Sequence, residues 1–247
     1  MANIYLTDQT RDVLDTLVDL VNYTAEGVLE VVLRDTIFRP AGGGQPADTG
    51  VVMFGGAEAP IAGAVKRDGK AWLKLQTSAA LLRGSKVQIQ IDGARRRQLS
   101  RAHTLTHIMM AAFRQQASGF ASKGAAIAED GRSVEIRFMA DTGYTPDLPA
   151  AEAWIQDAIN DDLPVDIIHA KDMSAALRAF PELRVDPDLG LTGKVRIVSI
   201  FGRDANPCSG THARSTAELA GLRLGPHRQV DDFTMISAHL AEAPSGT

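Results

Sequence analysis

Two pairs of side chains in this chain are of the types that bind zinc. His103 and His107 lie four residues apart, and Cys208 and His212 repeat that spacing about a hundred residues later. Four residues make about one helical turn, so the first pair is expected on one face of a helix. Imidazole and thiolate are the ligands that zinc prefers. The two pairs favour a metal site if the fold brings them together.

Each pair alone has a less specific interpretation. A lone histidine on a helix is usually a surface or satisfied core residue, and a lone cysteine in a glycine-containing loop is usually a small buried one. Cys208 is the only cysteine, so its place in the second pair makes coincidence less attractive. The zinc-peptidase motif requires Glu directly after the first His, and Thr104 stands there instead. Zinc peptidase chemistry of that type is therefore disfavoured.

A glycine-rich stretch, Arg39 to Gly50, is the second candidate for function. Gly42, Gly43 and Gly44 can adopt positive φ and allow a ligand or another backbone to approach closely. A plain turn between two strands would use the same residues. The stretch lacks the Lys-Ser/Thr ending of a nucleotide-binding phosphate loop, which excludes that motif.

Short apolar runs separated by glycine-rich turns fill the first ninety or so residues. Strands are expected at 28–33, 51–54, 71–75 and 87–91. Runs of this length and spacing are typical of a small β-barrel or sandwich. Residues 11–21 have apolar side chains at helical spacing, so a short helix is expected there.

The pattern changes near Gly93. Residues 95–117 contain no Gly or Pro, and their apolar side chains recur every three or four positions, which predicts an amphipathic helix. Further strands are expected at 134–138, 165–168 and 195–200, and helices at 150–159 and 174–180. We predict a β-barrel-like domain over 1–94, which carries the glycine-rich loop, and an α+β domain over 95–247. The tail 242–247 is expected to fray.

The composition indicates a globular protein of a reducing compartment. Hydrophobic residues make up 45% of the 247 positions and charged residues 23%, which suits one or two domains with a buried core. Apolar stretches fall short of a membrane span, the N-terminus does not resemble a secretory signal, and the single cysteine precludes an internal disulfide. A cytoplasmic location is therefore expected.

The formal net charge of −4 is not that of a typical nucleic-acid binder, so any such contact would need a local basic face. The run 95–97 followed by Arg101 is the clearest candidate, although most charge runs are simply solvated helix surfaces.

Four stretches in order resemble the alanyl-tRNA editing proteins (the AlaX family) and the related editing domain of alanyl-tRNA synthetases. They are Phe38-Arg39-Pro40-Ala41-Gly42-Gly43-Gly44-Gln45-Pro46 with Asp48-Thr49-Gly50, His103-Thr104-Leu105-Thr106-His107, Ser122-Lys123-Gly124 and Cys208-Ser209-Gly210-Thr211-His212. The resemblance implies a small β-barrel joined to an α+β editing domain. It implies zinc (Zn²⁺) bound by His103, His107, Cys208 and His212. It also implies hydrolysis of the ester that joins a misattached serine, or a misattached glycine, to alanine tRNA.

The resemblance also suggests roles for other residues. Gly42, Gly43, Gly44 and Gln45 would support activity from beside the editing domain. Thr106 would recognise the serine hydroxyl, although it could equally cap or pack within its helix.

Lys123 would contact the terminal nucleotide or the oxyanion, and Asp204 would orient a ligand or water, unless it only caps a loop. Ser122 stands near the substrate pocket where the family usually has Gln, which leaves the amino-acid preference open. Ser209 replaces the usual Gly after the cysteine, a small change.

Zinc could activate water and polarise an ester carbonyl, but four protein ligands usually mark a structural site. Two functions other than tRNA editing also stay open. One is a non-catalytic, zinc-stabilised tRNA-binding module. The other is a zinc hydrolase of small amino-acid esters or amides, which the acidic pI of about 5.9 slightly favours.

Overall fold

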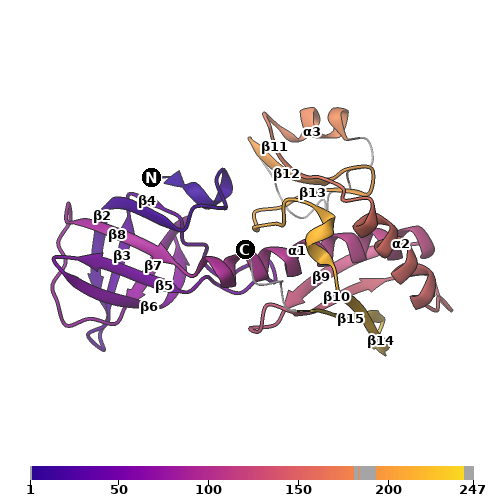
Figure 1. Ribbon diagram of the computed structural model, residues 1–247, viewed down its shortest axis with the longest axis horizontal. Coiled ribbons are helices and arrows are strands. Elements are labelled where there is room, and N and C mark those ends of the chain that lie inside the picture. Colours follow the sequence, from indigo (N-terminus) through magenta and orange to yellow (C-terminus); the bar gives the residue numbers. More distant parts are fainter. Residues whose placement is uncertain (1, 181–182, 184–192, 242–247) are drawn as a thin grey trace. The chain divides into compact units, whose positions relative to one another are not determined.

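The computed structural model describes residues 2–180, 183 and 193–241, and the chain divides into two compact units (Figure 1). The first unit is Met1–Arg97 and the second is Gln98–Thr247. The segment 242–247, for which the sequence predicts fraying, lies outside the described residues. Within the described part of the chain, no helix is long and apolar enough to cross a membrane.

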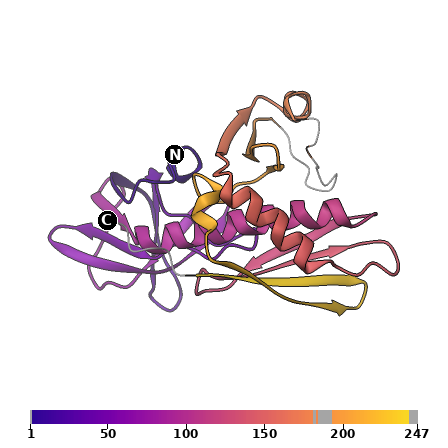
Figure 2. The same cartoon turned by 45° about the vertical axis from the view of Figure 1, so that its right-hand side comes forward.

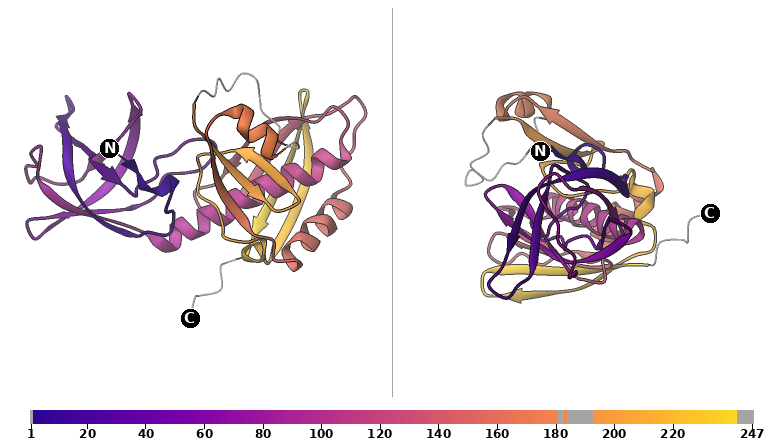
Figure 3. Two further views of the ribbon diagram at one scale, coloured as in Figure 1. Left: turned by 90° about the horizontal axis from the view of Figure 1, so that it is seen from above. Right: turned by 90° about the vertical axis from the view of Figure 1, so that its left-hand side faces the viewer.

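The first unit is a closed barrel of six strands in the order β2-β3-β7-β6-β5-β8 (Figures 1 and 3). The barrel strands are β2 (Val13–Tyr23), β3 (Leu29–Leu33), β5 (Gly50–Phe54), β6 (Ala57–Arg67), β7 (Lys70–Leu75) and β8 (Lys86–Ile91). A short parallel pair, β1 (Ala2–Asn3) with β4 (Asp35–Thr36), and a 3-10 turn, η1 (Ile4–Leu6), complete the unit. The β-barrel prediction is confirmed.

Every second side chain along a barrel strand points inward, and these inward side chains fill the barrel. Along β8, Val87, Ile89 and Ile91 are buried and the intervening residues are partly or fully exposed, as period-two geometry requires. The strand β3 is buried at all five positions, including Glu30, whose carboxylate accepts hydrogen bonds from Asn22 and Arg67. The buried apolar side chains of β8 belong, with Leu29, Val31 and Leu33 of β3, to one apolar core inside the barrel.

The helix expected at 11–21 is wrong, because residues 13–21 belong to strand β2. It pairs with both β8 and β3, and so closes the barrel. The register shifts between Val18 and Leu20, which disrupts the alternation that would have identified a strand. β6 escaped prediction because Pro60 and Gly63, both rare inside strands, interrupt it.

Over its described residues, the second unit combines helices with two antiparallel sheets, which confirms its α+β class. Its helices are α1 (Gly93–Gln116, whose first residues belong to the first unit), α2 (Leu148–Asn160) and α3 (Met173–Ala179), with a 3-10 turn, η3 (Thr216–Leu219). The four-stranded sheet has the order β14 (Leu222–Val230), β15 (Phe233–Leu240), β10 (Ser133–Met139) and β9 (Ala121–Ile127). The three-stranded sheet consists of β11 (Val165–Ala170), β12 (Val195–Ile200) and β13 (Asp204–Pro207).

Helix α1 lies at the centre of this unit. Its apolar side chains pack with those of α2 and the four-stranded sheet in one core, and Figure 2 shows both helices against the same face of that sheet. Its polar side chains Ser100, His103 and Thr104 are buried as well. A helix buried on its polar side needs hydrogen-bond partners there, and the segment that follows β13 supplies them.

We expect the buried ion pair Arg96–Asp48 to be essential for the first unit. Both side chains are almost inaccessible, and the Arg96 guanidinium bonds both carboxylate oxygens. Arg96→Met would leave Asp48 as a buried charge without this partner, at a cost of about 3–5 kcal/mol. Urea unfolding of Trp154→Phe protein, in which Trp72 is the sole fluorescent tryptophan, measures the loss.

Arg97→Met is the matched control, because Arg97 is exposed and only approaches Asp12, at 3.8 Å. Its effect should stay within about 0.5 kcal/mol. Equal midpoints for the two variants would contradict the structural role assigned to Arg96.

Candidate metal centre

Four potential ligands from distant parts of the sequence converge in the second unit. One ligand atom from each of His103, His107, Cys208 and His212 lies within 4.8 Å of the other three, and we call these residues the candidate metal centre. The first two project from adjacent turns of α1, and the other two lie in the segment after β13. Cys208 Sγ is 3.6 Å from Nε2 of His103 and 3.3 Å from Nε2 of His212.

The cysteine is held from both sides. The Gly210 amide donates to Cys208 Sγ at 3.3 Å, which favours the thiolate. The Cys208 amide donates to the Arg196 carbonyl, and the Arg196 guanidinium donates to the Cys208 carbonyl at 2.5 Å. These bonds fix the thiol position relative to β12.

A threonine hydroxyl orients His212. Thr104 Oγ1 is 3.1 Å from Nδ1 of His212, 3.1 Å from the Ser100 carbonyl oxygen, and 3.0 Å from the amide nitrogen of Ala213. If the single hydroxyl proton goes to the Ser100 carbonyl, Nδ1 of His212 must be the donor to Thr104. The Nε2 lone pair of His212 then points to the candidate metal centre.

A carboxylate orients His107 in the same way. Nδ1 of His107 lies 3.2 Å from Oδ2 of the buried Asp204, so Nε2 is left for a metal. Asp204 also accepts from Arg114 at 3.2 Å and from Asn206 at 2.5 Å. It lies at the start of β13 rather than at a loop cap.

The electrostatics of the site favour the protonation states that bind a metal, a thiolate and a neutral imidazole, at Cys208 and His212. Burial opposes ionisation of the Cys208 thiol. The charges of His103 and His212 and the hydrogen bonds with His103 and His107 together outweigh burial, so the pKa of Cys208 is held well below its usual value. Burial, with repulsion from His103, lowers the pKa of His212 to about 3. Burial also disfavours a charged His107, but hydrogen bonds with Asp204 and Cys208 raise the pKa of His107 to about 10. A bound cation would therefore replace a proton on His107.

Three nitrogens and one thiolate form a donor set that suits zinc. His103 and His212 are buried, whereas His107 and Cys208 are partly accessible and mark the open side of the candidate metal centre. The arrangement can therefore hold a metal ion.

Thr106, Ser122 and Lys123 lie on elements beside this group. Thr106 is buried on α1, and its hydroxyl donates to the His103 carbonyl at 2.7 Å. Ser122 Oγ lies 3.4 Å from Sδ of Met110, three residues beyond His107 on α1. The exposed Lys123 occupies a bulge of β9, where the register shifts opposite β10. The bulge uses Gly124 at a φ of 106°.

The basic residues singled out in the sequence are mostly engaged within the protein. The Arg101 side chain is buried and donates to the carbonyls of Glu218 and Ala241 and to the Gln98 side chain. The donors of Arg101 are thus engaged by acceptors of the protein itself, which gives this side chain a structural role. Arg96 is likewise buried in its ion pair with Asp48.

The glycine-rich stretch forms a tight turn on the first unit. Gly42 and Gln45 exchange backbone hydrogen bonds, and Gly43 and Gly44 have φ of 56° and 77°, which non-glycine residues rarely adopt. The Arg39 guanidinium binds the carbonyls of Pro40, Gly42, Gln45 and Pro46. The exposed tip, Ala41 to Gly44, is thus presented on a rigid base.

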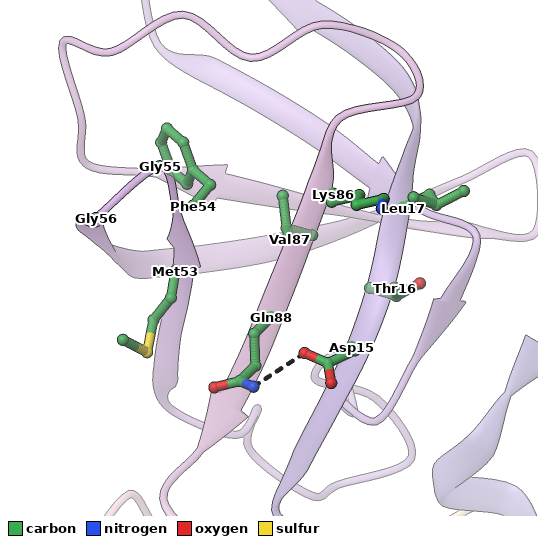
Figure 4. Close-up of a pocket in the computed structure, with 10 residues that line it drawn as sticks. All are labelled: Asp15, Thr16, Leu17, Met53, Phe54, Gly55, Gly56, Lys86, Val87 and Gln88. Atoms are coloured by element: carbon green, nitrogen blue, oxygen red, sulfur yellow. Dashed lines mark hydrogen bonds between the residues drawn. The ribbon is translucent and has the colours of Figure 1, made fainter.

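The barrel has its own open groove of about 590 Å³, formed by β2, β5, β8 and the turn at Gly55 and Gly56 (Figure 4). Its main polar contact is a hydrogen bond of 2.9 Å from Gln88 to Asp15. No cysteine or histidine lines it. The candidate ligands for a metal are therefore found in the second unit and not in this groove.

Thr104, Arg114, Asn206 and Arg196 are the residues of this site that sequence reasoning missed. Only Arg114 had a usable signal, because it follows His107 at a spacing of seven residues on the same helix. The other three reveal their role only through contacts across the fold.

The fold and the ligand set define a two-unit protein with a candidate metal centre. Comparison with known proteins identifies proteins of similar sequence. The chain is similar over most of its length to alanine–tRNA ligases. It is 32% identical to that of Methanoculleus marisnigri over 200 residues, 78% of this chain and 21% of the relative. The identity is 29% with that of Natronomonas pharaonis (92% of this chain, 24% of the relative) and 27% with that of Staphylothermus marinus (97% and 25%).

These matches confirm the resemblance to alanyl-tRNA synthetases that the motifs indicated. The chain spans only about a fifth to a quarter of the length of these relatives. A scan against protein-family models gave no match.

We expect Thr104→Val to weaken metal binding. The substitution keeps the side-chain shape but removes the oxygen that contacts His212 and Ala213. Loss of such an orienting partner typically costs about 10–100-fold in metal affinity. Competition with a chelator measures the apparent zinc dissociation constant.

Thr106→Val is the matched control, because its hydroxyl contacts only a carbonyl of its own helix. Zinc affinity should stay near wild type in that variant. Equal affinities of the two variants would refute the role given to Thr104.

Proposed function

We propose that this protein is a zinc-dependent aminoacyl-tRNA deacylase that removes serine misattached to alanine tRNA, acting in trans on the released aminoacyl-tRNA. Glycine is the second amino acid to test. The observation that carries the proposal is the convergence of His103, His107, Cys208 and His212 in a chain similar to alanine–tRNA ligases. We further propose that residues 95–247 carry the chemistry, and that residues 1–94 form an accessory barrel.

Zinc bound at the candidate metal centre would lower the pKa of a water molecule and polarise the ester carbonyl. The protein's part is to hold the ligands. Asp204 keeps a proton on Nδ1 of His107, and Thr104 does the same for His212. Both rings then present Nε2 in a fixed orientation, so little rearrangement accompanies the reaction.

Selectivity for serine would depend on a hydroxyl-binding group, for which we propose Thr106. Its own proton is committed to the His103 carbonyl, so Thr106 can only accept a hydrogen bond. A serine hydroxyl can donate that bond, and alanine has no such donor. A site that binds the substrate hydroxyl can reject the analogue lacking it by about 10⁴-fold or more.

The remaining roles concern the RNA. We propose that the exposed Lys123 binds the terminal nucleotide of the tRNA and that Ser122 faces the amino acid attached to it. We also propose that the turn from Gly42 to Gln45 supports the bound acceptor end of the tRNA. With a net charge of −4 and with Arg96 and Arg101 buried, phosphate contacts would depend on exposed cations such as Arg97. The single cysteine and the translation enzymes among its relatives support a cytoplasmic location.

The second candidate function is a zinc-stabilised tRNA-binding module without catalysis. It is favoured by the four-ligand set, because metal sites closed by four protein ligands are usually structural. It predicts salt-dependent tRNA binding without turnover. Hydrolysis of small amino-acid esters would instead be insensitive to salt.

Deacylation of alanine tRNA charged with serine, glycine or alanine distinguishes these functions. We expect fast loss of serine, slow loss of alanine, abolition by metal stripping and recovery with zinc. Cys208→Ala should behave like stripped protein, because it removes one ligand. Zinc-loaded, folded protein that binds tRNA but releases none of the three amino acids would support the binding module instead.

Thr106→Val tests the proposed source of selectivity. Losing the acceptor should slow serine removal and bring the serine and alanine rates together, while zinc affinity stays near wild type. The ratio of kcat/KM for the two substrates is the measurement. An unchanged ratio would reject this role of Thr106 and leave the deacylase proposal standing.

A further inference from the structure

We infer that Arg114 is a positioning residue of the candidate metal centre, which acts on His107 through Asp204. The inference rests on the metal-dependent function proposed above. It concerns a residue that lies outside the ligand set and outside the four sequence stretches that resemble the editing proteins.

The position of Arg114 on α1 points toward the metal ligands. His103, His107, Met110 and Arg114 follow one another at spacings of four, three and four residues, which places them along one face of the helix. The first two end in the candidate metal centre, and Arg114 continues the same row by contacting Asp204.

Asp204 needs the charge that Arg114 carries. Its side chain is fully buried, with one oxygen on Arg114 and the other shared by His107 and Asn206. A buried carboxylate is stable only when it is paired and hydrogen-bonded. A histidine that binds metal is neutral, so among these three partners Arg114 is the one that stays cationic in the metal-bound protein.

The guanidinium is itself held in place. Arg114 lies over the ring of Phe120 at 5.6 Å, and Phe120 stacks on the buried Phe138 at 4.8 Å. Only 26% of the Arg114 side chain is exposed. A continuous row of contacts therefore runs from the apolar core through Phe120, Arg114 and Asp204 to His107.

Arg114→Met tests this row. Methionine keeps much of the apolar stem but loses the charge and the donor to Asp204. We expect zinc affinity to fall at least about tenfold, as for other partners of metal ligands. The Co²⁺-loaded variant should show an altered visible absorption spectrum, because the orientation of His107 changes. Arg114→Lys restores the charge without the planar donor group, and should recover part of the affinity.

Arg137→Met is the matched control. Arg137 also lies over a phenylalanine, Phe233 at 5.3 Å, and donates to a backbone carbonyl, but no contact links it to Asp204 or to the ligands. Its zinc affinity and Co²⁺ spectrum should equal those of wild type. This control separates loss of a surface arginine from loss of the contact with Asp204.

A double-mutant cycle with Asp204→Asn decides whether Arg114 acts through the carboxylate. If it does, Arg114→Met should change zinc affinity little once Asp204 is already Asn. Full additivity, or wild-type affinity and spectrum in Arg114→Met, would overturn the inference and leave the metal centre intact. Wild-type protein that binds neither Zn²⁺ nor Co²⁺ would instead overturn the proposed centre itself, and this inference with it.

Discussion

The buried polar side of α1 sets the requirement that the rest of the second unit meets. A central helix that encloses hydroxyls and imidazoles must give each of them a partner, because an unsatisfied buried polar group costs about 1–3 kcal/mol. The segment after β13 provides these partners. Thr211 accepts from Ser100 at 2.8 Å, and His212 and Ala213 meet the hydroxyl of Thr104. The contacts that satisfy α1 also bring Cys208 and His212 to His103 and His107.

The ligand side chains are also held by contacts with the rest of the protein. Two of the rings have their Nδ1 atoms engaged by oxygens from another element, and the cysteine is tied to β12 through Arg196. Such outer contacts set the tautomer and orientation of each ligand. Placing most of these contacts on helices and strands rather than on free loops makes the geometry reproducible.

In both units, buried arginine side chains bond acceptors of the protein itself. Arg96 and Asp48 form a buried pair in the first unit, and Arg101 joins α1 to the backbone carbonyls of Glu218 and Ala241. Arginine suits this work because its several donors can satisfy more than one acceptor. Of the basic residues between 95 and 101, Arg96 and Arg101 are therefore engaged within the protein, whereas Arg97 is exposed.

The sequence by itself determined the types of the candidate metal ligands and the helix that carries two of them. It also determined the barrel, from strands in which apolar and polar side chains alternate. These properties are local, since a helical turn and a strand period can be read from neighbouring residues. It misjudged 11–21, where a register shift hides the strand, and it passed over β6, where Pro60 and Gly63 interrupt the pattern. Only the tertiary structure brought His107 to Asp204, 97 positions away, and Thr104 to His212, 108 positions away. Contacts at such separations depend on how whole elements pack, which no local periodicity encodes.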